Sequence, residues 1–175
     1  MFGRNLMFTL IKRRKIYSSK WIELYVDSIK DNDINIDNFH VLHYPKESVV
    51  VLLKKGDSFL FVKALRYITK SEEIELPAGN IEDGESAIDA AKREVFEETG
   101  IMSKNLKVLG SFYPSNGMSD QIIHVVGAEY NGGNETVQKG ETTEILWFSK
   151  SEIVRLIQND TLKDGVTMAA MSFQN

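Results

Sequence analysis

One segment of this sequence, GNIEDGESAIDAAKREVFEETGI from Gly79 to Ile101, constrains its fold more than any other. The Asp83-Gly84 pair is a turn signal, and the residues after it have the periodicity of an amphipathic helix, roughly Glu85 to Thr99. Gly100 follows the last helical turn, where glycine suits a left-handed C-cap. We expect the apolar side of this helix to pack on a sheet through Ala87, Ile88, Ala91, Val95 and Phe96.

The acidic side of the same helix predicts a site for a divalent metal ion. A helix returns to one face every three or four residues, so Glu94, Glu97 and Glu98 project to the same side. Like charges at this spacing repel, which indicates a cation among them, and Mg²⁺ and Mn²⁺ prefer carboxylate, carbonyl and water oxygens. The alternative is an ordinary solvated helix face. The fixed spacing of seven residues favours a metal site for phosphate chemistry: Gly79, Glu85, Arg93, Glu94, Glu97, Glu98 and Gly100.

These seven positions match the Nudix box, G-x5-E-x7-R-E-U-x-E-E-x-G-U, in which the aliphatic positions U are Val95 and Ile101. The chain therefore resembles the Nudix hydrolases. The resemblance implies a hydrolysis, dependent on Mg²⁺ or Mn²⁺, of a nucleoside diphosphate linked to another group. It also implies the α/β/α sandwich of that family, built on a mixed β-sheet.

Three pieces outside the box resemble the ADP-ribose and nucleotide-sugar pyrophosphatases: Arg66-Tyr67, Glu75-Leu76-Pro77-Ala78-Gly79 and Phe112-Tyr113-Pro114-Ser115. We therefore expect cleavage of ADP-ribose, or of a related nucleoside diphosphate sugar, into a nucleoside monophosphate and a sugar phosphate. Segments 63–65 and 115–121 depart from the subfamily pattern, so other substrates stay open: GDP-mannose, a dinucleotide or a damaged nucleotide. A non-catalytic sensor that binds ADP-ribose is a further alternative.

The resemblance assigns the metal ligands to two nearby pieces of the chain. The backbone carbonyl of Ala78 and the carboxylates of Glu94 and Glu98 correspond to the main ligands. Glu97 corresponds to a further ligand, either direct or through water, and is counted among the catalytic residues as well.

The resemblance also assigns catalytic roles. Arg93 corresponds to the arginine that orients the box carboxylates, and Glu85 is its expected partner. A surface pair of Arg93 with Glu97, one helical turn away, is the alternative for this arginine. The general base of the resembling group comes from a loop before the last strand, where Glu141 aligns. The alternatives for the base are Glu144 and Glu135.

Substrate contacts are expected from Arg66, Tyr67, Pro114 and Ser115. The guanidinium of Arg66 can pair with a phosphate or stack on an aromatic base, although an edge-strand arginine is an equal alternative. Tyr67 either lines the pocket or belongs to the core. The histidines have no metal-ligand spacing and are interpreted as structural or surface residues: His40, His43 and His124.

The remaining pattern predicts mixed α and β structure. Ser48 to Lys54 and Ser58 to Arg66 are β-branched or aromatic runs around a Gly-Asp turn, which indicates a hairpin. Lys20 to Ser28 alternates as a strand of a small N-terminal β-sheet extension, whereas Asp31 to Asn38 is polar and turn-rich. Later strands and helices are expected over Lys107–Tyr113, Gln121–Tyr130, Glu144–Phe148, Ser151–Asn159 and Asp164–Phe173. We divide the chain into N-terminal strands, 1–45, and a Nudix hydrolase domain, 46–175.

Length, net charge and cysteine content limit the number of domains and the kinds of binding site that this chain can have. A chain of 175 residues has the usual length of one compact domain, and a net charge of −4 argues against a broad surface for nucleic acid. Cysteine is absent, which excludes disulfides, zinc thiolates and a cysteine nucleophile and permits a cytoplasmic location.

The N-terminus predicts no membrane association. Its apolar residues precede the basic run Lys12-Arg13-Arg14-Lys15, the reverse of a signal peptide, and are too few to span a bilayer. The basic run is interpreted as a solvated edge, with an anion-binding patch as the alternative. The resembling subfamily commonly dimerises through its N-terminal strands, which implies a homodimer with Trp21 to Val26 at the interface.

Overall fold

The structure is a computed structural model that describes residues 8–31, 34–137 and 140–174. These residues form two units. The first contains the described part of Met1–Lys46 together with Tyr113–Gln121, and the second contains Glu47–Phe112 together with the described part of Ile122–Asn175. A segment that follows the middle of the chain therefore belongs with the N-terminal strands.

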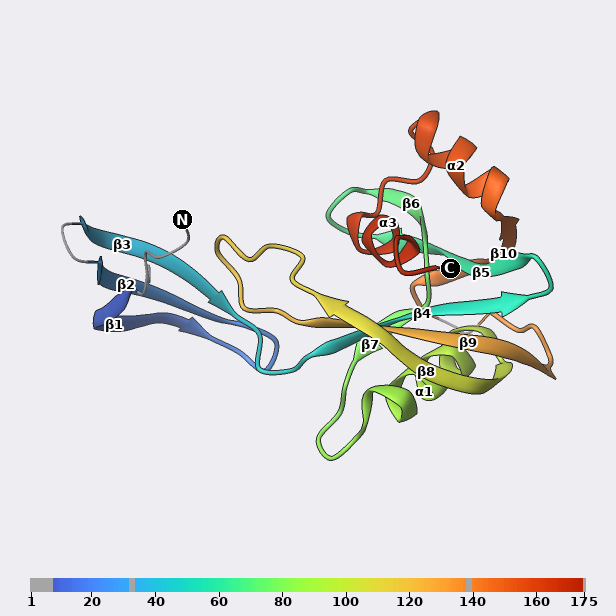
Figure 1. The fold of residues 1–175 in the computed structure, drawn as a ribbon, viewed down its shortest axis with the longest axis horizontal. Coiled ribbons are helices and arrows are strands. Elements are labelled where there is room, and N and C mark those ends of the chain that lie inside the picture. The colour runs from blue at the N-terminus through green and yellow to red at the C-terminus, as the bar shows by residue number, and fades with distance from the viewer. Residues whose placement is uncertain (1–7, 32–33, 138–139, 175) are drawn as a thin grey trace, which may run out of the picture. The chain divides into compact units, whose positions relative to one another are not determined.

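The first unit is a three-stranded antiparallel sheet in the order β1-β2-β3 (Figure 1). Its strands are β1 (Thr9–Ser18), β2 (Glu23–Asp31) and β3 (Ile34–His43). The interpretation of residues 31–38 as a polar turn is wrong, because β3 begins at Ile34 and pairs Asn35 with Lys30 and Ile36 with Ile29. Pairing with β2 fixes this strand, and its polar side chains face solvent without cost.

Part of the N-terminal basic run is paired within its own sheet. Arg13 donates two hydrogen bonds to the carboxylate of Asp27, at 2.9 and 2.7 Å, and Lys15 donates one to Glu23 at 2.6 Å. Both cations also lie over the ring of Tyr25, at 4.6 and 5.3 Å from its centroid. At these two positions the basic run is tied to β2.

The described residues of the first unit bury no apolar side chain. Its two buried residues are both acidic, Asp27 and Asp31. Large apolar side chains on the same strands and turn are exposed, among them Leu10, Ile11 and Trp21, which is 60% exposed. A sheet without an apolar core of its own is marginally stable in water.

The second unit contains a seven-stranded mixed sheet in the order β10-β5-β4-β9-β8, with β6 beside β5 and β7 beside β4 (Figure 1). Strands β4 and β9 are parallel, and the other pairs are antiparallel. The strands are β4 (Ser48–Lys55), β5 (Ser58–Arg66), β6 (Ser71–Glu75), β7 (Ala78–Asn80), β8 (Ile101–Phe112), β9 (Ile123–Gly133) and β10 (Thr142–Ser149).

Helices cover both faces of this sheet (Figure 1). They are α1 (Ala87–Thr99), α2 (Lys150–Gln158) and α3 (Gly165–Met171). Alternate side chains of β4 face opposite ways: Val50 and Leu52 pack in the core under α2 and α3, whereas Val49, Val51 and Leu53 pack in the core under α1. The expected α/β/α sandwich on a mixed sheet, with a small N-terminal sheet, is confirmed.

The helix of the box differs from its prediction in detail. It begins at Ala87, after the N-cap Ser86, and ends as expected before Gly100. Ile88 and Phe96 were expected in the core but are 39% and 52% exposed. The buried positions of α1 are Ala90, Ala91, Val95 and Thr99. Small side chains let the helix approach the sheet closely, and the larger apolar residues lie at the margin of the contact.

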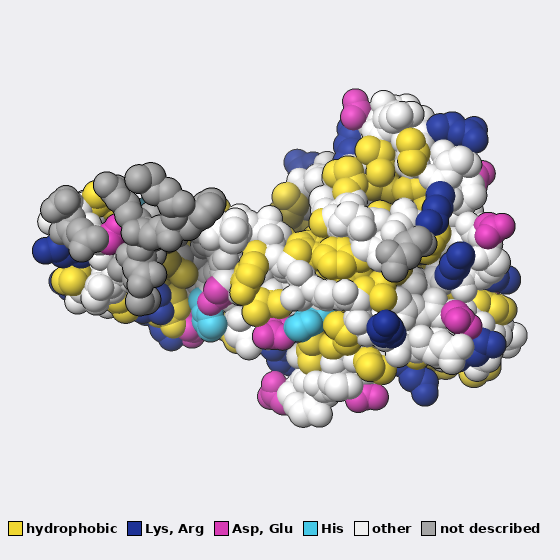
Figure 2. Space-filling model, in the orientation of Figure 1, with side chains coloured by type: hydrophobic (Ala, Val, Ile, Leu, Met, Phe, Trp, Pro, Cys, Tyr) yellow, Lys and Arg dark blue, Asp and Glu magenta, His cyan; other side chains and the backbone are white. Residues whose placement is uncertain are grey.

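The surface of the second unit carries mixed charge. On the face drawn in Figure 2, Lys and Arg side chains are scattered among Asp and Glu, and no broad basic area is present on that face. Among the residues that the structure describes, no helix combines the length and apolar character needed to cross a bilayer.

Candidate active site

Strand β7 and the residues before it are fixed against the core. The carbonyl of Pro77 accepts a hydrogen bond from the amide of Val51 at 2.9 Å, and Ala78 pairs with Val50 on β4. The amide of Leu76 donates to Thr167 Oγ1 of α3 at 2.9 Å. The backbone that leads into the box therefore has little freedom to move.

Helix α1 is fixed at both ends and lies against β7. The hydroxyl of Ser86 accepts a hydrogen bond from the amide of Asp89, and Gly100, with φ of 68°, donates its amide to Phe96 O at 2.8 Å. The helix passes so close to β7 that a Cβ on Gly79 would lie 2.0 Å from Glu94 Oε1. Any side chain at this position would displace the carboxylate of Glu94.

Arg93 joins the loop before α1 to the acidic face of the helix. It donates two hydrogen bonds to Glu85, both 2.9 Å, and one to the carbonyl of Asn80 at 2.9 Å. It also donates to Glu94 at 2.7 Å and to Glu97 at 3.1 Å. The hydrogen bonds with Glu85 raise the pKa of Arg93 above its usual value. Its contacts therefore go well beyond a surface pair with Glu97.

Two carboxylates on α1 sit in an environment that disfavours negative charge. Burial raises the pKa of Glu98 to about 8, and the charge of Glu94 adds to this effect, whereas a backbone hydrogen bond from Ala78 opposes it. Burial also raises the pKa of Glu94, against the opposing effect of Arg93. Glu98 Oε2 is buried and has no hydrogen-bond partner among the described residues. A cation at this oxygen would satisfy it and favour both charges.

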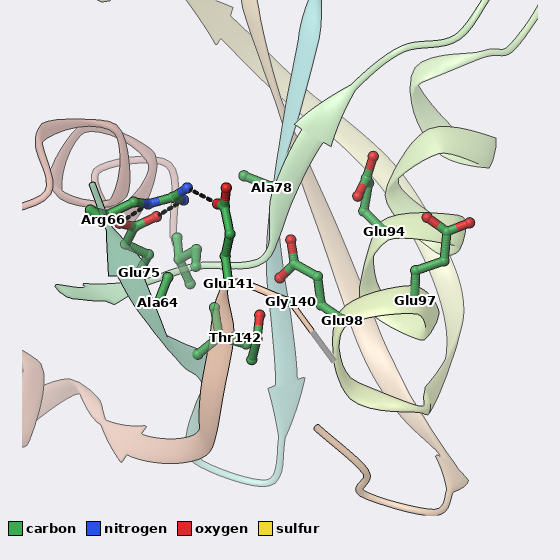
Figure 3. A pocket seen from close by; sticks show the side chains of 12 residues that line it. Ala64, Arg66, Glu75, Ala78, Glu94, Glu97, Glu98, Gly140, Glu141 and Thr142 are labelled. Carbon is green, nitrogen blue, oxygen red and sulfur yellow. Dashed lines mark hydrogen bonds and ion pairs between the residues drawn. The ribbon is translucent and has the colours of Figure 1, made fainter. Parts of the chain in front are cut away.

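These residues line an open pocket of about 270 Å³. Its lining includes five glutamates and one arginine, so acidic groups outnumber basic ones. In Figure 3, Glu94, Glu97 and Glu98 approach from α1, and Arg66, Glu75 and Glu141 face them from the opposite side. The full lining is Val62, Ala64, Arg66, Glu75, Leu76, Ala78, Glu94, Glu97, Glu98, Gly140, Glu141 and Thr142. An anionic ligand can enter such a pocket only together with cations.

The acidic side chains do not yet converge as a complete ligand set. Among the described residues, no three His, Cys, Asp or Glu side chains are grouped so that they could hold a metal ion as they stand. Glu94 and Glu97 instead direct one oxygen each at Nη1 of Arg93. The second oxygen of each carboxylate has no hydrogen bond to Arg93 and could bind a metal ion.

Arg66 lies between two carboxylates on the far side of the pocket. It donates to both oxygens of Glu75, at 2.8 and 2.5 Å, and to Glu141 at 2.5 Å (Figure 3). The two alternative candidates for the base lie elsewhere: Glu144 pairs with Lys63, and Glu135 pairs with Lys55. Neither belongs to the pocket lining.

The other expected substrate contacts are not part of this lining. Tyr67 follows the end of β5 and is 87% exposed. Pro114 and Ser115 belong to the segment that groups with the N-terminal strands. Of the histidines that have an ion pair, His43 contacts Asp120 in the first unit and His124 contacts Glu47 in the second; the pocket lining has no histidine.

Sequence reasoning gave no role to one prominent residue of the pocket, Glu75. Its side chain is 12% exposed and lies between two buried residues, Ile74 and Leu76. The available signal was a carboxylate inside an apolar stretch, because a buried acid requires a partner. The partner, Arg66, is supplied by the pairing of β6 with β5.

Comparisons with known proteins agree with this geometry. A family model described as the NUDIX domain matches residues 44–170. The chain is 28% identical over 166 residues, 93% of its length and 90% of the other, to the ADP-ribose pyrophosphatase of Bacillus subtilis (strain 168). It is 36% identical over 103 residues, 58% of its length and 38% of the other, to the NAD-capped RNA hydrolase NudC of Haemophilus influenzae. A crystal structure of an ADP compounds hydrolase has the same fold, with TM-score 0.83, 17% identity and coverage of 98% and 94%.

Proposed function

The chain is a hydrolase that belongs to the Nudix family, and we propose that it cleaves the diphosphate of ADP-ribose or of a related nucleoside diphosphate sugar. The products would be a nucleoside monophosphate and a sugar phosphate. The observation that carries the proposal is the pocket, in which the box glutamates face Glu141 and Glu98 keeps a buried oxygen without a described partner. The relative from B. subtilis, which is matched over nearly the whole chain, supports the substrate class.

The reaction requires Mg²⁺ or Mn²⁺, because a hard divalent cation suits the carboxylate and carbonyl oxygens of this pocket. We assign its ligands to the backbone carbonyl of Ala78 and to Glu94 and Glu98, with Glu97 as a further ligand, direct or through water. A metal ion held by these residues would supply positive charge to the diphosphate and lower the pKa of a bound water molecule. The unpartnered oxygen of Glu98 supports this assignment.

Arg93 and Glu85 hold the acidic face of α1 in place. Arg93 donates two hydrogen bonds to the carboxylate of Glu85 and a third to the carbonyl of Asn80. The same guanidinium contacts Glu94 and Glu97. Its role is to orient these carboxylates and to limit their mutual repulsion before the substrate arrives.

We assign the general base to Glu141. A base must lie within hydrogen-bond reach of the water from which it takes a proton. The carboxylate of Glu141 lines the pocket opposite the box, whereas Glu144 and Glu135 are engaged by Lys63 and Lys55 outside it. This separation favours Glu141 over both alternatives.

The resemblance assigns the nucleoside and sugar contacts to Arg66, Tyr67, Pro114 and Ser115, and we propose this role for the last three. Among these residues, Arg66 lines the pocket. Relatives that act on a different diphosphate, such as the NAD-capped RNA hydrolase of H. influenzae, favour a dinucleotide as the second candidate substrate.

We also propose a homodimer formed through the N-terminal sheet. The supporting observation is that the described part of this unit exposes Leu10, Ile11 and Trp21 and buries no apolar side chain. A second copy that packs on this sheet would remove these side chains from water. Light scattering after size-exclusion chromatography tests the proposal, and a stable monomer at micromolar concentration would contradict it.

The test of function is a substrate panel of ADP-ribose, ADP-glucose, GDP-mannose, UDP-glucose, NADH and diadenosine polyphosphates. Each is incubated with Mg²⁺, with Mn²⁺ or with a chelator, and the products are separated by chromatography. AMP released from ADP-ribose with strict metal dependence is the expected result. Faster cleavage of NADH or GDP-mannose would reassign the substrate, and binding of ADP-ribose without turnover of any compound would indicate a sensor.

A further inference from the structure

Carboxylates that line the pocket engage all three nitrogens of the Arg66 guanidinium. Its Nε and Nη2 donate to the two oxygens of Glu75, at 2.8 and 2.5 Å, and its Nη1 donates to Glu141 Oε2 at 2.5 Å. Two parallel hydrogen bonds between an arginine and a carboxylate fix the plane of the guanidinium as well as its position. Arg66 is therefore held in a defined orientation rather than free to follow a ligand.

Glu75 provides a rigid support for this arrangement. It lies on β6 directly opposite Val62 of β5, and its neighbours Ile74 and Leu76 are both buried. Its own side chain is 12% exposed. The hydrogen bonds that Arg66 donates to Glu75 raise the pKa of Arg66 above its usual value, so the arginine stays charged. The support thus comes from the core of the second unit.

Glu141 differs from Glu75, because its backbone is fixed but its side chain is largely exposed. Its carbonyl accepts a hydrogen bond from the amide of Leu65 at 2.8 Å, and the next residue, Thr142, pairs with Ala64 on β5. Its side chain, however, is 72% exposed, and the ion pair described for it is the one with Arg66. An exposed glutamate without such a contact samples many rotamers.

We propose that Arg66 is a positioning residue that holds the carboxylate of Glu141 toward the pocket and is itself held by Glu75. This inference rests on the proposed function, because it takes Glu141 as the general base. It differs from a direct substrate contact, because Arg66 acts through the carboxylate of Glu141, to which it donates a hydrogen bond at 2.5 Å. A misplacement of a reacting group by about 1 Å can cost about a hundredfold in rate, so the contact has a measurable effect.

A double-mutant cycle tests the proposal. The variants are Arg66→Lys, Glu141→Gln and the combination of both, with Arg155→Lys on the exposed surface of α2 as the matched control. Arg66→Lys keeps the positive charge but loses the planar guanidinium, which makes two parallel hydrogen bonds with Glu75. We expect it to lower kcat by about 10- to 100-fold with KM within about twofold. In the Glu141→Gln background it should have no further effect on kcat, because the group that it positions is gone.

The opposite pattern would overturn the inference. If Arg66 contacts the substrate directly, Arg66→Lys raises KM, and its effect multiplies with that of Glu141→Gln in the double variant. Wild-type activity in Glu141→Gln would also refute it, by removing Glu141 as the base. Failure of the wild-type protein to hydrolyse any compound of the panel would instead refute the proposed function itself.

A second variant keeps the test decisive if Arg66→Lys does not fold. Glu75→Gln removes the charged support but retains the side-chain shape, and thermal unfolding monitors the fold of each variant. It should also lower kcat without a change in KM, and this loss should disappear in the Glu141→Gln background. A loss of the same size in both backgrounds would mean that Glu75 acts independently of Glu141.

Discussion

Replacement of Gly79 by alanine tests whether the close approach of β7 and α1 serves the site or the fold. An ideal Cβ at this position lies 2.0 Å from Glu94 Oε1, 2.1 Å from its Cδ and 2.5 Å from its Oε2. Ordinary van der Waals contact begins at 3.4 Å, so the carboxylate must move by about 1.4 Å. No backbone atom is among the three nearest, and the clash therefore falls on the mobile end of a side chain.

The expected effects on stability and on activity therefore differ in size. The main structural loss is the hydrogen bond from Arg93 to Glu94, which is partly exposed and worth about 1 kcal/mol. For a chain of this length that corresponds to about 2–4 °C in Tm. A shift of more than 1 Å in a metal ligand is expected to lower kcat by about 100-fold.

The assay measures kcat on the best substrate, the Mg²⁺ concentration for half-maximal rate, and Tm for Gly79→Ala. Gly165→Ala is the matched control, because a Cβ there meets nothing within 4 Å. It should retain wild-type kcat and metal dependence. Unchanged kcat and metal dependence in Gly79→Ala would refute the reasoning, and so would a loss of more than about 10 °C in Tm, which would place the strain in the backbone.

Three further predictions concern single side chains. Glu98→Gln should abolish metal-dependent turnover without lowering Tm, because it replaces a buried carboxyl group, whose charged form burial disfavours, by a neutral amide of the same shape; wild-type activity would exclude Glu98 as a ligand. Glu85→Gln should lower kcat by about tenfold at unchanged fold, since Arg93 loses its bidentate partner, and steady-state kinetics with circular dichroism checks this. The hydrogen bond from Lys15 is the main cause that lowers the pKa of Glu23 from 4.5 to about 2. Its stabilising effect is thus present above pH 4.5 and lost as the pH falls toward 2, and an NMR titration that gives a value near 4.5 would disprove it.

The sequence predicted those helices and turns whose structure is specified within a few neighbouring residues. The box helix, Gly100 at its end and the hairpin of β4 and β5 were identified because periodicity and turn residues specify them over a few residues. Strand β3 was missed because its polar sequence resembles a loop, and only its pairing with β2 makes it a strand. Strand β1 was missed for a different reason: every residue in it is exposed, and the basic run at its centre interrupts any alternation of buried and exposed positions.

The same distinction applies to the pocket. Glu94, Glu97 and Glu98 could be grouped from the sequence because one helix carries all three. Glu141 and Arg66 come together only through the pairing of β10 with β5, which has no local signature, so they were found by family resemblance. The role of Glu75 depends on the pairing of β6 with β5, and the sequence pattern did not predict β6.

The composition of the first unit has a consequence for biosynthesis. The unit also includes Tyr113–Gln121, where the carbonyl of Met118 accepts the amide of Leu42 at 2.8 Å. During synthesis, β1 to β3 leave the ribosome before this segment, and Glu47–Phe112 of the second unit is made between them. Until Tyr113–Gln121 has emerged the unit is incomplete, and incompletely packed nascent chains are prone to aggregate. This unit is therefore completed later than the position of its strands in the chain suggests.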